Sequence, residues 1–388
     1  MHDNNKLIIA AAGSGKTSFL IDEAIRNKEA KILITTYTIA NSDEIRKKFI
    51  EKHGRVPLNV DIQTWFSFLI QHGVKPFQAH FNKDLSSCNV NGLLLTTTKS
   101  GVKYKTKSGI DVCYKEAEIK EHYFSKEGRV YSDKLSKFVV GGGDQYRETA
   151  ERKQFVALVF ERLERIYDQI YIDEVQDLAG YDLIFLKHLF TSSINIQLVC
   201  DPRQVTYLTH HEAKFNKYKD GKIKEYILSE CKGSFKDENI DEKSLSVSHR
   251  NNEAICKLSS ALYPDYTDSV SCECCECGQE HSGIFLVKKD QVHNYLATHD
   301  GIVQLRDKRT VPVNEGYKAV NFGESKGLTF GRVLIYPTSE MIKWLKNNNH
   351  KLAPTSRAKF YVAITRAVYS VGIICDEDIQ VKGIEKAF

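Results

Sequence analysis

The sequence predicts an α/β fold built on parallel sheets. A short apolar run, Leu7 to Ala10, is typical of a buried strand and leads into the glycine-containing loop 13–16. Beyond Thr17, apolar residues recur at helical spacing, so strand, loop and helix follow one another in order. A chain of 388 residues is expected to form two compact domains with a small insertion.

The loop after the first strand is expected to bind phosphate. Glycines let backbone N–H groups approach an anion closely, and the following helix presents its N-terminus to the same anion. Lys16 adds a cation and Thr17 a hydroxyl that can bind Mg²⁺, although Ala10 replaces the usual first glycine. The candidate nucleotide-binding residues here are Ala12, Gly13, Ser14, Gly15, Lys16, Thr17 and Ser18. The alternative is a Gly-Ser-Gly turn without a ligand.

Composition limits the class of protein. A net charge of +5 suits a polyanionic partner and equally an ordinary soluble surface. No apolar run is long enough to cross a membrane, and the polar N-terminus leads into the first strand, so we expect no signal peptide. The ten cysteines form no framework of small disulfide loops, which favours a reducing, cytoplasmic location.

The next segments continue the α/β pattern. Residues 31–36 are typical of a second buried strand and 41–51 of an amphipathic helix. Thr38 lies near the carboxyl end of that strand, where open parallel sheets place ligands, so it is a candidate nucleic-acid contact. Thr64 and Phe66 belong to an aromatic cluster that is expected in the core, with stacking on a base as the alternative.

Residues 77–150 differ in character because turn residues multiply there. Lys103, Lys105 and Lys107 alternate as in a strand, so three ammonium groups are expected on one face of a hairpin. Such a face could follow nucleic-acid phosphates, and the alternative is a solvated hairpin. Three consecutive glycines, 141–143, are expected to form a flexible joint before a charged helix at 146–167.

Two carboxylates follow the next buried strand. Asp173 can hold Mg²⁺ through its waters, and Glu174 can polarise a water for attack on a γ-phosphate. After a further strand at 194–200, Gln204 could sense the γ-phosphate, or it could belong to a turn started by Asp201-Pro202. Together with the phosphate loop, these residues predict an NTPase.

Eight segments, in order along the chain, resemble the motifs of UvrD/Rep-like superfamily 1 DNA helicases. They are residues 10–17, 36–48, 64–69, 172–177, 201–207, 248–250, 325–330 and 361–367. The resemblance implies two RecA-like α/β domains that hold one ATP between them. The implied domains are 1–76 with 147–210 (ATP-binding), an inserted subdomain at 77–146, and a second RecA-like domain at 211–388.

The resemblance also implies roles for single residues. Thr17 and Asp173 would serve Mg²⁺, and Glu174 would activate the water. Arg250 and Arg366 would reach across from the second domain to stabilise transition-state charge, a task suited to the planar guanidinium. The alternative for either arginine is a surface ion pair. Lys16 and Gln204 complete the implied catalytic set, and His249 and Gly327 complete the nucleotide-binding set.

The chain departs from the family at several positions. His249 occupies the position where the family usually has a tyrosine that stacks on adenine. Thr329 replaces a glutamate that contacts the ribose in the family. The selectivity of this chain for base and sugar is therefore left open. Phe66 and Gly323 replace histidines, and the interval between Arg250 and Lys326 is too short for the family's large inserted subdomain. The ATPase set is therefore nearly complete, whereas the DNA-handling set is reduced.

A cysteine-rich loop at 272–281 lies in that short interval. Its thiols are Cys272, Cys274, Cys275 and Cys277. They form two overlapping Cys-x-x-Cys pairs, which could bind zinc, although structural zinc sites usually draw on well-separated pairs. A redox or disulfide role and an exposed variable loop are the alternatives.

The function that we expect is Mg²⁺-dependent ATP hydrolysis by a compact helicase-like motor on single-stranded nucleic acid, with DNA favoured. The alternative is a nucleotide-gated regulatory ATPase subunit of a multi-protein assembly, such as an anti-phage system. In that case a nuclease or effector protein would be the partner.

Overall fold

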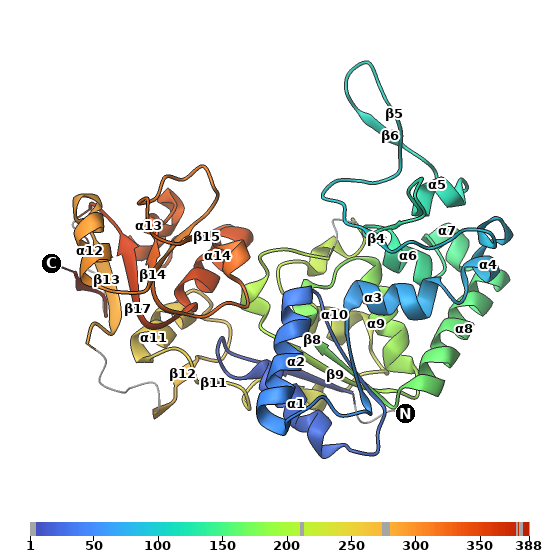
Figure 1. Ribbon diagram of the computed structural model, residues 1–388, viewed down its shortest axis with the longest axis horizontal. Coiled ribbons are helices and arrows are strands. Elements are labelled where there is room, and N and C mark those ends of the chain that lie inside the picture. Colours follow the sequence, from blue (N-terminus) through green and yellow to red (C-terminus); the bar gives the residue numbers. More distant parts are fainter. Residues whose placement is uncertain (1–4, 210–212, 274–279, 378, 380–382, 388) are drawn as a thin grey trace. The chain divides into compact units, whose positions relative to one another are not determined.

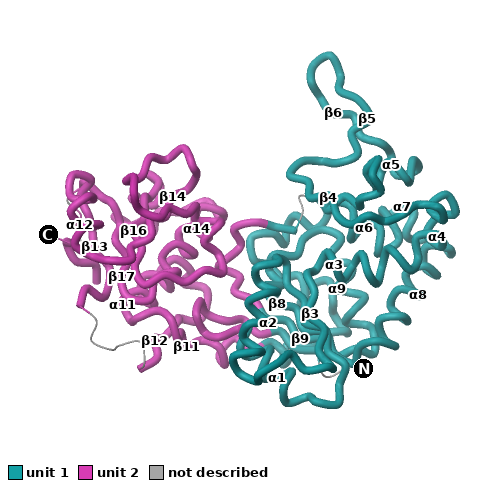
Figure 2. The backbone as a smooth tube through the Cα atoms, viewed as in Figure 1, with its two compact units in different colours: residues 1–7, 17–199, 208–240 teal, residues 8–16, 200–207, 241–388 magenta. Residues whose placement is uncertain are grey.

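The computed structural model describes residues 5–209, 213–273, 280–377, 379 and 383–387. By their internal contacts these residues form two units (Figure 2). Unit 1 comprises residues 1–7, 17–199 and 208–240, and unit 2 comprises residues 8–16, 200–207 and 241–388. The phosphate loop is thus grouped with unit 2, whereas Thr17 and the carboxylates after residue 172 belong to unit 1.

The first sheet has six strands among the described residues, and its order is that of an open α/β sheet. In sheet order they are β10 (Ile240–Asp241), β1 (Lys6–Ile9), β9 (Asn195–Cys200), β8 (Gln169–Asp173), β2 (Ile32–Thr36) and β3 (Val60–Thr64). The pairs β2–β3, β2–β8 and β8–β9 are parallel. Every residue of β2 is buried, as expected for a strand covered on both faces.

Three helices of unit 1 begin at side-chain caps, namely α2 (Ile39–His53), α3 (Trp65–Leu69) and α8 (Ala150–Ile166). Its other long helices are α1 (Lys16–Arg26), α9 (Tyr181–Thr191) and α10 (Ile223–Glu230). The charged helix predicted at 146–167 is interrupted, because Thr149 caps α8 by accepting a hydrogen bond from the Arg152 N–H. Residues before this cap form a separate short helix, α7 (Asp144–Arg147).

The inserted segment is made of short elements around an aromatic core. They are α4 (Gln78–Phe81), β4 (Leu93–Leu94), β5 (Val102–Lys105), β6 (Asp111–Cys113), α5 (Ile119–Tyr123), β7 (Val130–Tyr131) and α6 (Leu135–Val139). The Phe81 ring stacks on Phe138 at 3.9 Å between centroids, and Phe155 of α8 packs edge-on against both. The β5–β6 hairpin extends away from the rest of unit 1 (Figure 1).

The second sheet also has six strands among the described residues, and all its pairs are parallel. In sheet order they are β15 (Ala319–Asn321), β14 (Ile302–Arg306), β16 (Phe330–Ile335), β17 (Ala367–Ile374), β13 (Gly283–Val287) and β18 (Glu385–Lys386). Its helices are α11 (Glu253–Ala261), α12 (Val292–Thr298), α13 (Ser339–Lys346) and α14 (Pro354–Ile364), and β11 (Val247–Ser248) pairs with β12 (Val270–Ser271).

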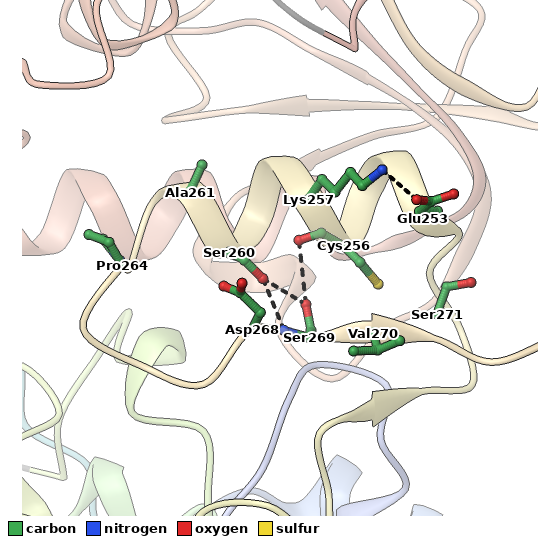
Figure 3. A pocket seen from close by; sticks show the side chains of 10 residues that line it. All are labelled: Glu253, Cys256, Lys257, Ser260, Ala261, Pro264, Asp268, Ser269, Val270 and Ser271. Carbon is green, nitrogen blue, oxygen red and sulfur yellow. Dashed lines mark hydrogen bonds and ion pairs between the residues drawn. The ribbon is translucent and has the colours of Figure 1, made fainter.

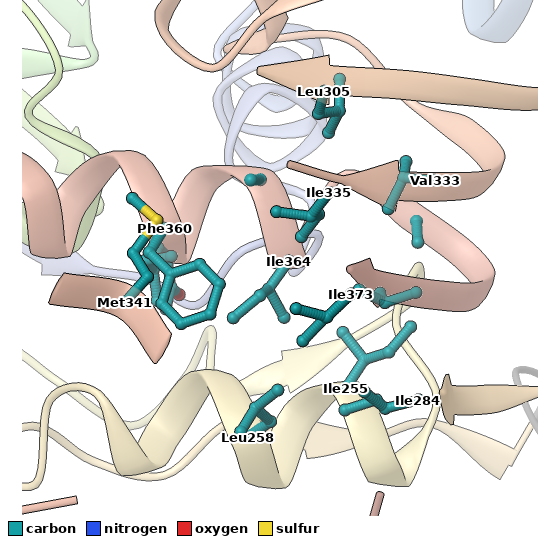
Figure 4. Close-up of a cluster of buried hydrophobic side chains, with 14 of the residues drawn as sticks. Ile255, Leu258, Ile284, Leu305, Val333, Ile335, Met341, Phe360, Ile364 and Ile373 are labelled. Carbon is teal, nitrogen blue, oxygen red and sulfur yellow. The ribbon is translucent and has the colours of Figure 1, made fainter. Parts of the chain in front are cut away.

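Helices cover both faces of the second sheet. Val333 and Ile335 of β16 pack with Phe360 of α14 and Ile255 of α11 (Figure 4). Leu334, between them, points to the other face and packs in a second cluster with Tyr295 of α12. The predicted α/β fold with two parallel-sheet, RecA-like domains is confirmed. Among the helices of the described ranges, none is long and apolar enough to cross a bilayer.

Candidate nucleotide-binding site

The phosphate loop begins where β1 ends. The Ala10 N–H donates to the carbonyl of Cys200 at 2.8 Å, and the Ser14 hydroxyl donates to the carbonyl of Ala11 at 2.9 Å. Gly13 and Gly15 both have left-handed backbone, with φ of 74° and 85°. Helix α1 begins directly after the loop, at Lys16, and the binding of an anion by the loop and the helix N-terminus stays a prediction.

Within unit 2, Gly13 lies against the segment that carries two predicted site residues. The His249 N–H donates to the Gly13 carbonyl at 2.9 Å. A Cβ added to Gly13 would lie 2.6 Å from Cβ of Arg250 and 2.7 Å from Oγ of Ser248. Both the positive φ and the close approach therefore require glycine. The structure thus brings Gly13 together with His249 and Arg250, from which it is far apart in sequence.

In unit 1, Thr17 lies close to Asp173, the last residue of β8. The Thr17 hydroxyl donates to Oδ2 of Asp173 at 2.9 Å, and Asp173 is 4% exposed. A hydroxyl and a carboxylate are hard oxygen donors, which is the chemistry that Mg²⁺ prefers, so these two residues fit the predicted ion.

Glu174 has an unusual backbone conformation. Its φ of 58° and ψ of 39° lie in the left-handed region, which costs a residue other than glycine about 1–3 kcal/mol. Its carboxylate accepts a hydrogen bond from the Gln176 amide. Such strain is concentrated at functional sites, which makes Glu174 a good candidate for a reacting group.

A buried polar network surrounds Asp201 in unit 2. Asp201 is fully buried, and its carboxylate accepts hydrogen bonds from Nε of Arg203 (2.7 Å), Nε2 of Gln204 (2.7 Å) and the Tyr361 hydroxyl (3.0 Å). Arg203 also donates to the Ala10 carbonyl at 2.9 Å. One carboxylate therefore links the start of the phosphate loop to Gln204 and to helix α14.

The charge of Asp201 is maintained by its neighbours. Burial by itself raises its pKa, but the Arg203 guanidinium and the Lys16 ammonium outweigh burial, so the pKa lies below the usual value. Asp201 is therefore an anion at neutral pH, and the phosphate-loop lysine is within its electrostatic influence.

The two predicted arginines are placed by backbone carbonyls. Arg366 is 1% exposed and donates to the carbonyl of Leu328 at 3.2 Å and to Oε1 of Gln204 at 3.3 Å. Arg250 donates to the carbonyl of Thr365 at 3.4 Å. Because Arg366 is buried, its alternative interpretation as a surface ion pair is wrong. Gln204 and Arg366, both assigned to the catalytic set, are in direct contact.

The residues predicted to contact nucleic acid in unit 1 have structural partners. Thr38 caps α2 by accepting from the Asn41 N–H, and Thr64 caps α3 by accepting from the Ser67 N–H. Phe66 is 5% exposed and packs edge-on against Tyr37 at 5.3 Å between ring centroids. The expectation of a core position for Phe66 is met, and its ring is not available for stacking on a base in this conformation.

The lysine hairpin differs from the expected arrangement. Strand β5 ends at Lys105, and Lys107 lies in the turn beyond it, so the three lysines do not form one face of a strand. Lys103 forms an ion pair with Glu118 (2.6 Å), and Lys105 forms one with Asp111 (3.0 Å). The alternation in the sequence was misleading because a glycine turn at 106–110 ends the strand early.

Gly327 and Cys272 lie elsewhere in unit 2. Gly327 is part of a turn and has φ of 84°, and the ammonium of its neighbour Lys326 lies 4.7 Å from the centre of the Tyr207 ring. Cys272 directly follows β12, whereas Cys274, Cys275 and Cys277 lie outside the described residues. In the described part of the chain, no cluster of three or more His, Cys, Asp or Glu side chains could hold a metal ion.

Two cavities of unit 2 lie apart from these residues. One, of about 540 Å³, is bounded by α11 and β12 and contains the linked hydroxyls of Ser260 and Ser269 (Figure 3). The other, of about 760 Å³, lies at the carboxyl ends of β16 and β17, beside Tyr336 and Cys375. Neither includes a predicted nucleotide-binding residue.

Sequence reasoning did not identify Asp201, Arg203 and Tyr361 as site residues. A weak signal was present, since Asp201 and Arg203 directly follow a buried strand. Tyr361 is a polar residue in the otherwise apolar run 360–364. The partners themselves could not be predicted, because the Asp201–Tyr361 hydrogen bond joins residues 160 positions apart.

Comparison with known proteins gives distant likenesses only. No family model and no curated protein matches the chain. Among solved structures it is similar to the crystal structure of Arterivirus nonstructural protein 10 (helicase), with TM-score 0.45, 14% identity and coverage of 96% of this chain and 60% of that chain. A complex of the same Arterivirus helicase with DNA gives TM-score 0.44, 14% identity and coverage of 96% and 61%.

A third structure, of PRRSV helicase, gives TM-score 0.43, 15% identity and coverage of 98% and 56%. The chain therefore spans about three fifths of the length of the solved helicases that it matches. None of the three structures is described as a UvrD/Rep-like protein. At these low similarities no family is assigned to the chain.

Proposed function

We propose that this chain is a Mg²⁺-dependent ATPase that acts as a compact helicase-like motor on single-stranded nucleic acid. The observation that carries the proposal is the hydrogen bond between Thr17 and Asp173 at 2.9 Å. It connects the residue after the phosphate-loop lysine to the carboxyl end of β8, where a strained Glu174 follows. This combination of a phosphate loop, a hard-oxygen pair and a poised carboxylate supports phosphoryl transfer to water.

Each residue of the site has a task in this proposal. The loop N–H groups and Lys16 bind the phosphates, and Thr17 and Asp173 hold the ion. When bound, Mg²⁺ supplies positive charge that offsets the phosphates. Glu174 accepts a proton from the attacking water, and Arg250 and Arg366 stabilise charge on the transferred group.

The test is the substitution Glu174→Gln, which keeps the shape of the side chain and removes its basicity. ATP binding should stay within about twofold of the wild type, whereas turnover should fall by roughly 10²–10⁴-fold. The matched control is Glu151→Gln, at an exposed position in the first turn of α8. Turnover that persists in Glu174→Gln, at the level of the control, would contradict the role of Glu174.

A second function is favoured by the nucleic-acid residues. Phe66 is buried, and Lys103 and Lys105 are already paired with carboxylates. These features favour a nucleotide-gated regulatory ATPase that makes little use of nucleic acid. Measuring ATP turnover with and without single-stranded DNA separates the two proposals, since strong stimulation supports the motor and indifference supports the switch.

A further inference from the structure

The β5–β6 hairpin is fixed at its base by a buried lysine. Lys134 is 2% exposed, and its ammonium donates to the Ser100 carbonyl at 2.9 Å. Asp133 accepts from the Ser100 hydroxyl (2.6 Å) and from the Ser100 N–H (3.1 Å). A buried ammonium is costly to leave without its partner, so the base of the hairpin is held firmly.

The tip of the hairpin is closed by hydrogen bonds. The Thr106 N–H donates to the Ile110 carbonyl at 2.9 Å, and the Ile110 N–H donates to the Thr106 hydroxyl at 3.0 Å. Gly109 supplies the positive φ of 79° that the turn requires. The hairpin is therefore an arm with defined geometry at both ends, and it projects from unit 1 (Figure 1).

The two faces of this arm differ in chemistry. Tyr104 lies opposite Val112, and Lys105 lies opposite Asp111, so the Tyr104 and Lys105 side chains are on opposite faces of the pleat. The Lys105 face is neutralised by its ion pair. On the other face, Tyr104 is 57% exposed, which leaves the ring accessible to a ligand.

The arm carries a strong excess of positive charge. From residue 99 to residue 115 it contains five lysines and one acidic residue, Asp111, which gives a net charge of +4. Within the described ranges, the ammonium groups of Lys99, Lys107 and Lys115 form no ion pair, and all three residues are exposed. An accessible aromatic ring among uncompensated cations suits a strand of bases and phosphates. Lysine-rich surfaces are unusual at protein–protein interfaces.

We propose that the hairpin binds single-stranded nucleic acid, with a base stacked on Tyr104 and phosphates contacted by Lys99, Lys107 and Lys115. This inference rests on the nucleic-acid part of the proposed function and changes which lysines carry it. Glu118 and Asp111 lie beside Lys103 and Lys105 and offset their positive charge, so these two lysines add little net charge toward a phosphate.

The test measures binding of the full chain to labelled oligo-dT and oligo-U by fluorescence anisotropy, without ATP, over a series of salt concentrations. Tyr104→Ala should weaken binding by about 5- to 150-fold, and Tyr104→Phe should restore most of it, because the ring and not the hydroxyl stacks. Circular dichroism of each variant checks that it is folded.

The lysines are tested by matched sets. Replacing Lys99, Lys107 and Lys115 together with Gln should lower the slope of log K against log salt by about 2, which corresponds to three phosphate contacts on a single strand. Replacing Lys103 and Lys105 with Gln is the control, and it should change the slope by less than about 1. Equal effects of the two sets would overturn the assignment of lysines.

The outcomes separate this inference from the proposed function. If the wild type binds either oligonucleotide and Tyr104→Ala binds equally well, the hairpin inference is overturned and the motor proposal stands. If the wild type binds neither oligonucleotide, the nucleic-acid part of the proposed function fails as well. Preference for oligo-dT or oligo-U identifies the kind of strand.

Discussion

The buried pair of Asp201 and Arg203 allows a quantitative prediction about stability. The substitution Arg203→Met keeps an unbranched side chain, shortens it and removes its charge. The Asp201 carboxylate then stays fully buried with three of its four donors, namely Gln204, Tyr361 and the backbone N–H of residue 203. It loses the 2.7 Å contact with the guanidinium.

The expected cost follows from leaving a charge uncompensated in the interior. Removing one partner of a buried ion pair costs about 3–5 kcal/mol of unfolding free energy. The double variant Asp201→Asn/Arg203→Met removes both charges, so it should be more stable than the sum of the single variants predicts, by about 2 kcal/mol. The matched control is Lys289→Met, which breaks an ion pair with Asp376 of similar length (2.9 Å) on the surface of the same unit. It should cost less than about 1 kcal/mol.

The two tryptophans provide the assay, because Trp65 lies in unit 1 and Trp344 lies in unit 2. In a Trp65→Phe background, the fluorescence of Trp344 during urea unfolding reports unit 2 alone. If Arg203→Met shifts the unfolding free energy by no more than Lys289→Met does, the reasoning from burial and charge compensation is wrong.

Two further predictions concern ATP binding. Tyr361→Phe removes the hydroxyl that joins Asp201 to the Ala12 N–H, so it should raise KM for ATP by about tenfold and cost about 1.5–3 kcal/mol of unfolding free energy, measured by steady-state kinetics and a thermal melt. A change in the melt without a change in KM would show that the hydroxyl only supports the fold. Gly13→Ala places a methyl group 2.6 Å from Cβ of Arg250 and should abolish nucleotide binding in a calorimetric titration. Normal affinity in that variant would mean that the loop rearranges freely.

The parts of the fold that were predictable are those encoded locally. The strand, the glycine loop and the start of the helix at residues 7–17 could be predicted from the spacing of apolar residues and from the composition of the loop. The carboxylates at 173 and 174 could be predicted as site residues because they stand at the end of a buried strand. Local patterns do not specify partners. The alternation of Lys103, Lys105 and Lys107 was visible, but the turn that removes Lys107 from the strand depends on hydrogen bonds within 106–110.

The hydrogen-bond network around Asp201 could not be predicted from the sequence either, because local patterns do not specify tertiary partners. Its donors come from the segment just after β9 and from α14, and only tertiary packing brings them to one carboxylate. Thr38 and Thr64 each cap the next helix, a role that the sequence did not indicate, and their contact with nucleic acid stays a prediction.

The left-handed backbone of Glu174 sets stability against activity at one position. Glycine adopts this conformation without the steric cost, so Glu174→Gly would relieve strain locally while it removes the carboxylate. If random variants are selected only for thermal stability, we expect glycine to be enriched at residue 174. The selected protein would then be more stable and inactive. To stabilise this chain and keep its activity, Glu174 must be kept and stabilising substitutions must be made at other positions.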